Sequence, residues 1–198
     1  MTVEKKILVF TATFNELDNI KELVSSIKKQ PSDPDILIID DNSPDGTSEE
    51  IKKLQNSFKN LFLIKRNGKF GLDSAHKEAY EFALKNNYDL LITMDADLSH
   101  DPNELGNFIK NLDEYPVVLG SRYISGGQCL MTGRRLIFSK YGNLIIKFVF
   151  QVDCSEFTTS YRGFNLKKLN NFHLNLIKTK GYSFFMGTVH EIFKQKFK

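Results

Sequence analysis

Residues 89–100 read DLLITMDADLSH, and this stretch decides the architecture that we expect for the chain. An apolar run of strand length leads to Asp95 and Asp97, and a polar segment with Pro102 then ends the strand. In an extended backbone, residues i and i+2 point to the same side, so the two carboxylates can converge on one divalent cation. Their hard oxygens suit Mg²⁺ or Mn²⁺, which completes its coordination shell with water and substrate phosphates. The stretch therefore predicts a buried strand that ends at a site for a metal–diphosphate complex.

Strand-length apolar runs alternate with helical patterns over residues 6–120. We expect strands at 6–13, 35–40, 61–64, 89–95 and 117–120, and helices at 17–27, from 47 onward, at 73–86 and at 102–112. A capping box of Thr47 and Glu50 is expected to open the second helix. Near-continuous apolar strands separated by helices predict an α/β fold with a mostly parallel central sheet flanked by helices.

The polar clusters of this part of the chain follow the ends of the expected strands. Ligands of such sheets bind beyond the carboxyl ends of the strands, so we expect these side chains to face one crevice. The residues concerned are Asn15, Glu16, Asp40, Asp41, Lys69, Asp95 and Asp97.

The chain after residue 120 has a different pattern. Residues 136–150 form a strongly apolar helical face, which suits either the protein core or a membrane surface. A polar segment follows at 156–164, to which we assign no regular structure, and a last helix is expected from about Tyr182.

Composition limits the classes of function. A chain of 198 residues with 41% hydrophobic content fits one domain, and a net charge of +3 is too small to indicate a nucleic-acid partner. Cys129 and Cys154 form no metal or disulfide pattern, which favours a reducing compartment. The sequence has no signal-peptide pattern and no apolar run near the roughly 18 residues of a spanning helix. We therefore expect a cytoplasmic protein, soluble or peripheral at the cytoplasmic membrane face.

Six motifs occur together along the chain. They are Thr13-Phe14-Asn15-Glu16, residues 38–47, Lys69-Phe70-Gly71-Leu72, residues 94–100, Gly120-Ser121-Arg122-Tyr123, and Arg135 with Ser139. With them the chain resembles glycosyltransferase family 2, the inverting nucleotide-sugar transferases of the GT-A fold, from about Ile7 to Phe164. Within that family it is most similar to the polyprenyl-phosphate sugar transferases typified by dolichol-phosphate mannosyltransferase. The resemblance implies a single GT-A domain over residues 1–198, and we expect it to be truncated at its C-terminus.

The resemblance also implies a donor site for a GDP- or UDP-linked hexose. The residues that it assigns to nucleotide-sugar binding are Ala12, Phe14, Glu16, Asp41, Lys69, Asp95 and Asp97. Asp95 and Asp97 are implied to hold Mg²⁺ or Mn²⁺, with Ser99 at the position of a third ligand, where the family often has Gln. Ala12 replaces the usual Pro of the first motif.

The acceptor implied by the resemblance is a polyprenyl phosphate, with Arg122, Arg135 and Ser139 as its phosphate-binding residues. A phosphate monoester has a second pKa of about 6 and needs no strong base at neutral pH. A sugar hydroxyl acceptor would need one, and Glu156 or Asp153 is then the candidate. The catalytic residues that we expect are Asp97, Arg122 and Glu156. The family element Asp-x-Thr-Ser-Gly-Phe-Arg reads Glu-Phe-Thr-Thr-Ser-Tyr-Arg here, at residues 156–162.

Other classes remain as alternatives. A nucleotidyltransferase would show a Gly-rich, basic loop after the first strand, where this chain has residues 14–17, and a dinucleotide enzyme would need Gly-x-Gly-x-x-Gly there. Two alternatives stay open: a family 2 transferase that acts on a glycan hydroxyl in cell-surface polysaccharide synthesis, and a non-catalytic nucleotide-sugar-binding protein.

Overall fold

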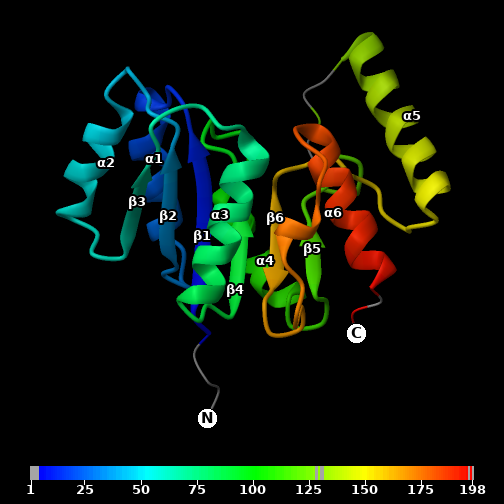
Figure 1. Ribbon diagram of the computed structural model, residues 1–198. Helices are drawn as coiled ribbons and strands as arrows, with labels where there is room; N and C mark the ends of the chain where they lie inside the picture. The colour runs from blue at the N-terminus through cyan, green and yellow to red at the C-terminus, as the bar shows by residue number, and fades with distance from the viewer. Residues whose placement is uncertain (1–4, 128, 130–131, 196, 198) are drawn as a thin grey trace.

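A computed structural model describes residues 5–127, 129, 132–195 and 197, and every structural statement below concerns these residues. Strands and helices alternate along the chain (Figure 1). In chain order the elements are β1 Ile7–Thr13, α1 Leu17–Lys28, β2 Asp35–Asp40, α2 Thr47–Gln55, β3 Leu61–Lys65, α3 Leu72–Lys85, β4 Leu90–Thr93, the 3₁₀ turn η1 Pro102–Glu104, α4 Leu105–Asn111, β5 Val117–Leu119, α5 Gly133–Phe150, β6 Arg162–Asn165, the 3₁₀ turn η2 Leu174–Leu176 and α6 Tyr182–Lys194.

The strands form one six-stranded sheet in the order β3-β2-β1-β4-β6-β5. Strands β1 to β4 pair in parallel, whereas β6 pairs antiparallel with β4 on one side and with β5 on the other. The expected α/β fold with a mostly parallel sheet is confirmed.

Helices cover both faces of the sheet. On one face, Val9 and Ile38 pack with Leu23 of α1 and with residues of α2 and α4. On the other face, Leu8 and Phe10 pack with α3 and α6 (Figure 1). Successive residues of β1 point to opposite faces and are buried on both, which explains the continuous apolar run in the sequence.

Strand β6 is the element that the sequence does not reveal. It consists of Arg162-Gly163-Phe164-Asn165, which lacks the β-branched run typical of strands, and yet all four residues are buried. Gly163 is required for packing because a Cβ atom there would lie 2.8 Å from the Leu112 side chain. Tertiary packing, rather than local propensity, therefore forms this strand.

One strand end and one helix cap differ from the sequence expectation. Strand β4 ends at Thr93, so Asp95 and Asp97 lie in the loop that follows and not in the strand. The expected capping box is wrong, because the N-cap of α2 is Gly46 at φ +95° and no side-chain bond caps the helix. The Thr47 hydroxyl instead donates to Asp45 Oδ1 at 2.6 Å.

Helix α5 lies at the edge of the molecule and stands away from the sheet (Figure 1). Its inner side contacts a small apolar cluster through Ile146 and Phe150. This cluster contains Phe157, from the segment after α5, and Val189 of α6. The outer side of α5 is largely uncovered. Among the described residues, no helix combines the length and the apolarity needed to cross a bilayer.

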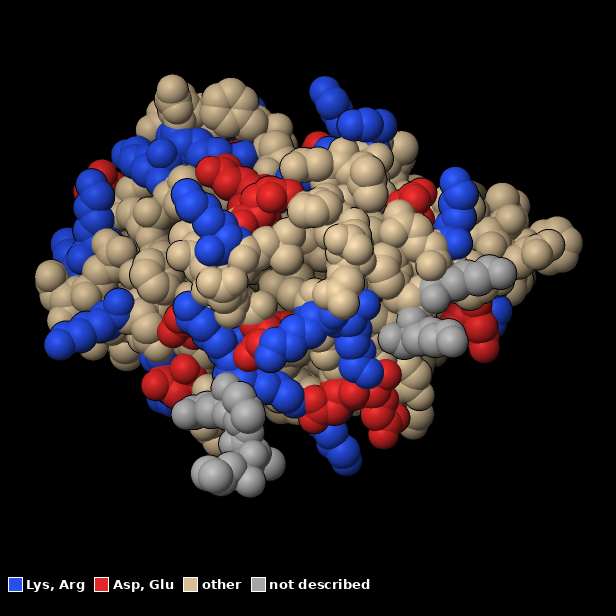
Figure 2. All heavy atoms as spheres, turned by 60° about the horizontal axis from the view of Figure 1, so that its bottom comes forward, with Lys and Arg blue, Asp and Glu red and all other residues tan. Residues whose placement is uncertain are grey.

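The face at the amino ends of the parallel strands carries mixed charge. Figure 2 shows basic and acidic side chains interspersed there. This pattern agrees with the small net charge of +3 and offers no extended field of one sign on that face.

Candidate active site

The loops after β1 and β2 are joined into one unit at the carboxyl edge of the sheet. The backbone N–H of Asn15 donates to Ser43 Oγ at 2.9 Å, and that of Glu16 donates to Thr47 Oγ1 at 3.0 Å. Asn15 has a φ of +63°, a left-handed conformation that Asn tolerates better than most residues. The motif with Phe14 and Glu16 is thus held against the motif with Asp41 by the fold itself.

Asp40 does not face the crevice, contrary to the sequence expectation. It is fully buried and accepts hydrogen bonds from Thr13, Ser43 and Ser48. Burial alone would raise the pKa of the Asp40 carboxyl, but these bonds outweigh it and hold the pKa below its ordinary value. Asp40 therefore shapes the loop and is not available to a ligand.

Asp41 is paired with a residue that sequence reasoning missed. Arg66 Nε donates to Asp41 Oδ1 at 2.5 Å, and Arg66 Nη1 donates to Ser74 Oγ at 2.6 Å. Both partners of the ion pair have mostly buried side chains. The only sequence signal for Arg66 is its place directly after the third strand.

The remaining nucleotide-binding candidates lie at or after the carboxyl ends of β1 and β3. Lys69 Nζ lies 4.0 Å from the centroid of the Phe14 ring, a cation–π contact that brings two sequence motifs together. Glu16 accepts a hydrogen bond from Asn19 at 2.8 Å. Ala12 is part of β1 and packs against the core on the α3 side of the sheet.

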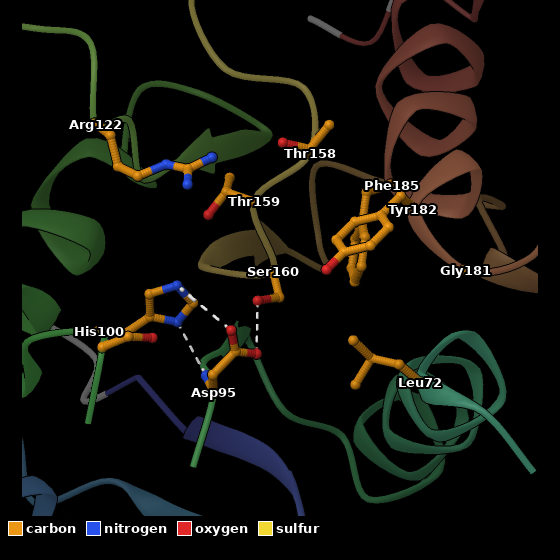
Figure 3. Close-up of a pocket in the computed structure, with 11 residues that line it drawn as sticks. Leu72, Asp95, His100, Arg122, Thr158, Thr159, Ser160, Gly181, Tyr182 and Phe185 are labelled. Carbon is orange, nitrogen blue, oxygen red and sulfur yellow. Dashed lines mark hydrogen bonds and ion pairs between the residues drawn. The ribbon is translucent and has the colours of Figure 1, made fainter. Parts of the chain in front are cut away.

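A cavity of about 460 Å³ opens beyond the carboxyl ends of the central strands. One wall is polar and the other is apolar, formed by Leu72 of α3 and by Tyr182 and Phe185 of α6 (Figure 3). The polar wall consists of Asp95, Ser99, His100, Arg122, Thr158, Thr159 and Ser160.

Asp95 is held from two sides at this polar wall. Ser160 Oγ donates to Asp95 Oδ1 at 2.6 Å, and His100 Nε2 lies 3.7 Å from Asp95 Oδ2 (Figure 3). His100 Nδ1 accepts the backbone N–H of Asp95 at 2.9 Å, which requires that nitrogen to be unprotonated. Burial lowers the pKa of His100 in spite of the nearby carboxylates.

Asp97 lies outside the cavity lining and is exposed. Its Oδ1 accepts the backbone N–H of Ser99 at 3.0 Å, in a turn that places Leu98 at φ +62°. Among the described residues, no group of three or more His, Cys, Asp and Glu side chains is arranged for a metal ion. The oxygens of Asp95, Asp97 and Ser99 are of the hard type that suits Mg²⁺ or Mn²⁺, and such ions take their remaining ligands from water and phosphate.

Arg122 faces the cavity and is fixed by a buried glutamate. Its Nε and Nη2 donate to Glu156 Oε2 at 3.0 and 2.9 Å. Glu156 is 0% exposed, and its Oε1 accepts the Thr158 hydroxyl at 2.7 Å. Glu156 thus reaches the cavity only through Arg122 and Thr158.

The other acceptor-side candidates differ in how close they lie to Arg122 and the cavity. The hydroxyl of Ser139, in α5, hydrogen-bonds at 2.5 Å to the hydroxyl of Tyr123, and Tyr123 directly follows Arg122 in the chain. The side chain of Arg135 lies outside the described part of the structure. Asp153 is exposed, pairs with Lys147 and does not line the cavity.

This geometry defines the class of protein. A mostly parallel sheet gathers an acidic pair, a cavity and a buttressed arginine at its carboxyl edge, as GT-A nucleotide-sugar transferases do. The family model "Glycosyl transferase family 2" matches residues 8–172, and the chain belongs to this family of glycosyltransferases.

Two relatives and two solved structures show how far the similarity extends. The chain is 32% identical over 183 residues to the polyprenol monophosphomannose synthase of Mycolicibacterium smegmatis, which covers 91% of this chain and 69% of that protein. It is 29% identical over 181 residues to the undecaprenyl-phosphate mannosyltransferase of Micrococcus luteus. The match covers 90% of this chain and 74% of that protein.

The structural neighbours support the fold. One is the glucosyl-3-phosphoglycerate synthase of Mycobacterium tuberculosis in complex with UDP, with a TM-score of 0.68, 16% identity, and coverage of 97% of this chain and 66% of that one. The other is a mannosyltransferase of Pyrobaculum calidifontis in complex with GDP-Man and Mn²⁺, with a TM-score of 0.55 and 18% identity. This chain spans 46% of the length of that protein, and 85% of this chain is covered.

Proposed function

We propose that this chain is an inverting, metal-dependent glycosyltransferase that moves a hexose from a GDP- or UDP-linked donor to a polyprenyl phosphate. The observation that carries the proposal is the cavity, with Asp95 and Arg122 on one polar wall. An anionic donor and an anionic acceptor can meet there. One relative is named a polyprenol monophosphomannose synthase and the other an undecaprenyl-phosphate mannosyltransferase, and both names support the same acceptor class.

The donor half of the site is built from the first three loops and the acidic pair. Phe14 with Lys69, and Asp41 with Arg66, would contact the nucleoside, and the contact within each pair supports this role. Asp95 and Asp97, with Ser99 as a third protein ligand, would hold Mg²⁺ or Mn²⁺, which when bound would supply positive charge to the diphosphate.

The acceptor half needs a cation rather than a base. A lipid phosphate is largely ionised at neutral pH, and the Arg122 guanidinium, oriented by Glu156, is suited to bind it. Both carboxylate oxygens of Glu156 already accept hydrogen bonds, and Asp153 lies away from the cavity. These placements favour a phosphate acceptor over a glycan hydroxyl.

The membrane is the expected source of this acceptor, and α5 is suited to contact it. Its outer side exposes seven large apolar side chains: Ile137, Phe138, Tyr141, Leu144, Ile145, Phe148 and Val149. The charged residues of α5 are all Lys or Arg, which suits an anionic lipid surface. Asn143 on its inner side accepts the backbone N–H of Phe157 at 3.0 Å, so α5 is tied to the loop that carries Glu156.

Transfer itself is the direct test. The chain should convert GDP-mannose or UDP-glucose, with Mn²⁺ and undecaprenyl phosphate, into an organic-extractable glycolipid. Transfer of the sugar only to an oligosaccharide acceptor would support the glycan alternative. Donor binding without any transfer would support a non-catalytic binding protein.

Removal of two apolar side chains from α5 should weaken membrane binding. We expect Phe138→Ser combined with Phe148→Ser to reduce partition into vesicles of phosphatidylglycerol and phosphatidylcholine by about tenfold or more, because each ring contributes buried apolar area. Vesicle co-sedimentation measures this change. Tyr115→Ser, at an exposed aromatic remote from α5 in the sequence, is the matched control and should bind like the wild type. Equal binding of the double variant would contradict the membrane role.

Loss of the Phe14 ring should weaken nucleotide binding. Stacking of a base on an aromatic ring contributes about 1–3 kcal/mol, so Phe14→Ala is expected to raise the Kd for the preferred nucleoside diphosphate by about tenfold. Calorimetric titration with GDP and UDP in Mn²⁺ measures the effect and identifies the base. An unchanged Kd for both nucleotides would remove Phe14 from the site.

A further inference from the structure

Ser160 contacts Asp95, one residue of the acidic pair, although it belongs to neither donor nor acceptor motif. It is 6% exposed and lies in the loop before β6, and its hydroxyl donates to Asp95 Oδ1 at 2.6 Å (Figure 3). It stands at the glycine position of the family element that residues 156–162 resemble. Glycine has no hydroxyl and could not form this hydrogen bond.

The backbone of Ser160 is fixed before any ligand binds. Thr93, the last residue of β4, donates its hydroxyl to the Ser160 carbonyl at 2.5 Å. The next residue, Tyr161, stacks on His100 with ring centroids 4.7 Å apart. Arg162 donates to the backbone carbonyls of Thr159, Phe157 and Phe185. The Ser160 hydroxyl is therefore set in place by the junction of β4 and β6.

The hydrogen bond divides the Asp95 carboxylate into two unlike oxygens. Oδ1 is occupied by Ser160, whereas Oδ2 has His100 Nε2 at 3.7 Å and no shorter polar contact among the described residues. The Asp95 side chain is 37% exposed and faces the cavity. One oxygen is thus anchored while the other is left for a ligand.

We infer that Ser160 is a positioning residue that orients Asp95 and so strengthens binding of a divalent cation with its nucleoside diphosphate. The inference rests on the proposed function, which assigns Asp95 to that complex. Groups that hydrogen-bond to a metal-ligating carboxylate restrict its orientation, and their loss typically costs about 10- to 100-fold in metal affinity or activity.

The test is a Mn²⁺-binding measurement that does not depend on turnover. Ser160→Ala and Ser160→Gly should each raise the Kd for Mn²⁺ in the presence of GDP or UDP by about tenfold, measured by electron paramagnetic resonance of free Mn²⁺. Ser160→Thr retains the hydroxyl and should recover most of the affinity. The KM for the acceptor should stay unchanged in all three variants, which separates a role at Asp95 from a general loss of structure.

Ser155→Ala is the matched control, because Ser155 lies on the same loop and, within the described part of the chain, its hydroxyl bonds to the Ser121 hydroxyl alone. It should bind Mn²⁺ like the wild type. A Kd for Ser160→Ala and Ser160→Gly within about twofold of the wild type would overturn the inference. Failure of the wild type to bind Mn²⁺ with any nucleotide would instead overturn the proposed function, so the two failures are distinguishable.

Discussion

Replacement of Asp97 by alanine is expected to lower the rate of sugar transfer by at least about a hundredfold, because it removes half of the acidic pair that the donor diphosphate requires. Asp97 is exposed, and its only described hydrogen bond is with the Ser99 backbone. The substitution should therefore leave the thermal unfolding temperature nearly unchanged. Initial rates with saturating donor and Mn²⁺ measure the effect.

A second Asp-x-Asp sequence, at residues 33–35, provides the control for Asp97. Asp33 is exposed and pairs with Lys28 at the opposite end of the sheet, where β2 begins. Asp97→Asn should behave like Asp97→Ala, whereas Asp33→Asn should transfer sugar at the wild-type rate. Full activity of Asp97→Ala would rule out the proposed mechanism.

The contrast between these two aspartate pairs shows what the sequence can predict. Both have the same spacing, but only Asp95 and Asp97 follow a buried apolar strand in a series of alternating strands and helices. That alternation determines a parallel sheet, and a parallel sheet determines the edge at which ligands bind. The fold class, and the edge of the sheet at which we place the candidate site, therefore follow from local patterns.

The partners of the site residues do not follow from local patterns. Arg66 pairs with Asp41, and Ser160 bonds to Asp95 from 65 residues away, because the sheet brings distant loops together. Glu156 is another residue whose environment does not follow from local patterns. As an acid in a polar segment it suggests a general base, yet the fold buries it completely beneath Arg122. Burial of a polar residue depends on packing that no neighbouring residue encodes.

The pairing of Arg122 with Glu156 leads to the second large effect. Arg122→Lys should raise the KM for polyprenyl phosphate by about a hundredfold while the Kd for the donor nucleotide stays constant. The guanidinium donates through Nε and Nη2 to Glu156 Oε2, which leaves its third nitrogen, Nη1, for a phosphate. A lysine ammonium is a single centre that cannot span both partners in this way. Initial rates at varied acceptor and saturating donor, with calorimetric titration of the nucleotide, separate the two effects.

Removal of Arg122 without a change at Glu156 would leave a buried carboxylate unpaired, which is strongly destabilising in most proteins. Arg122→Met combined with Glu156→Gln avoids that charge and should unfold near the wild-type temperature, while its acceptor KM should be as poor as that of Arg122→Lys. Glu156→Gln alone keeps the arginine but loosens it, so its acceptor KM should lie between those of the wild type and of Arg122→Lys. A wild-type KM in the stable double variant would show that the acceptor phosphate binds elsewhere, and α5 would then lead the lipid to a different part of the cavity.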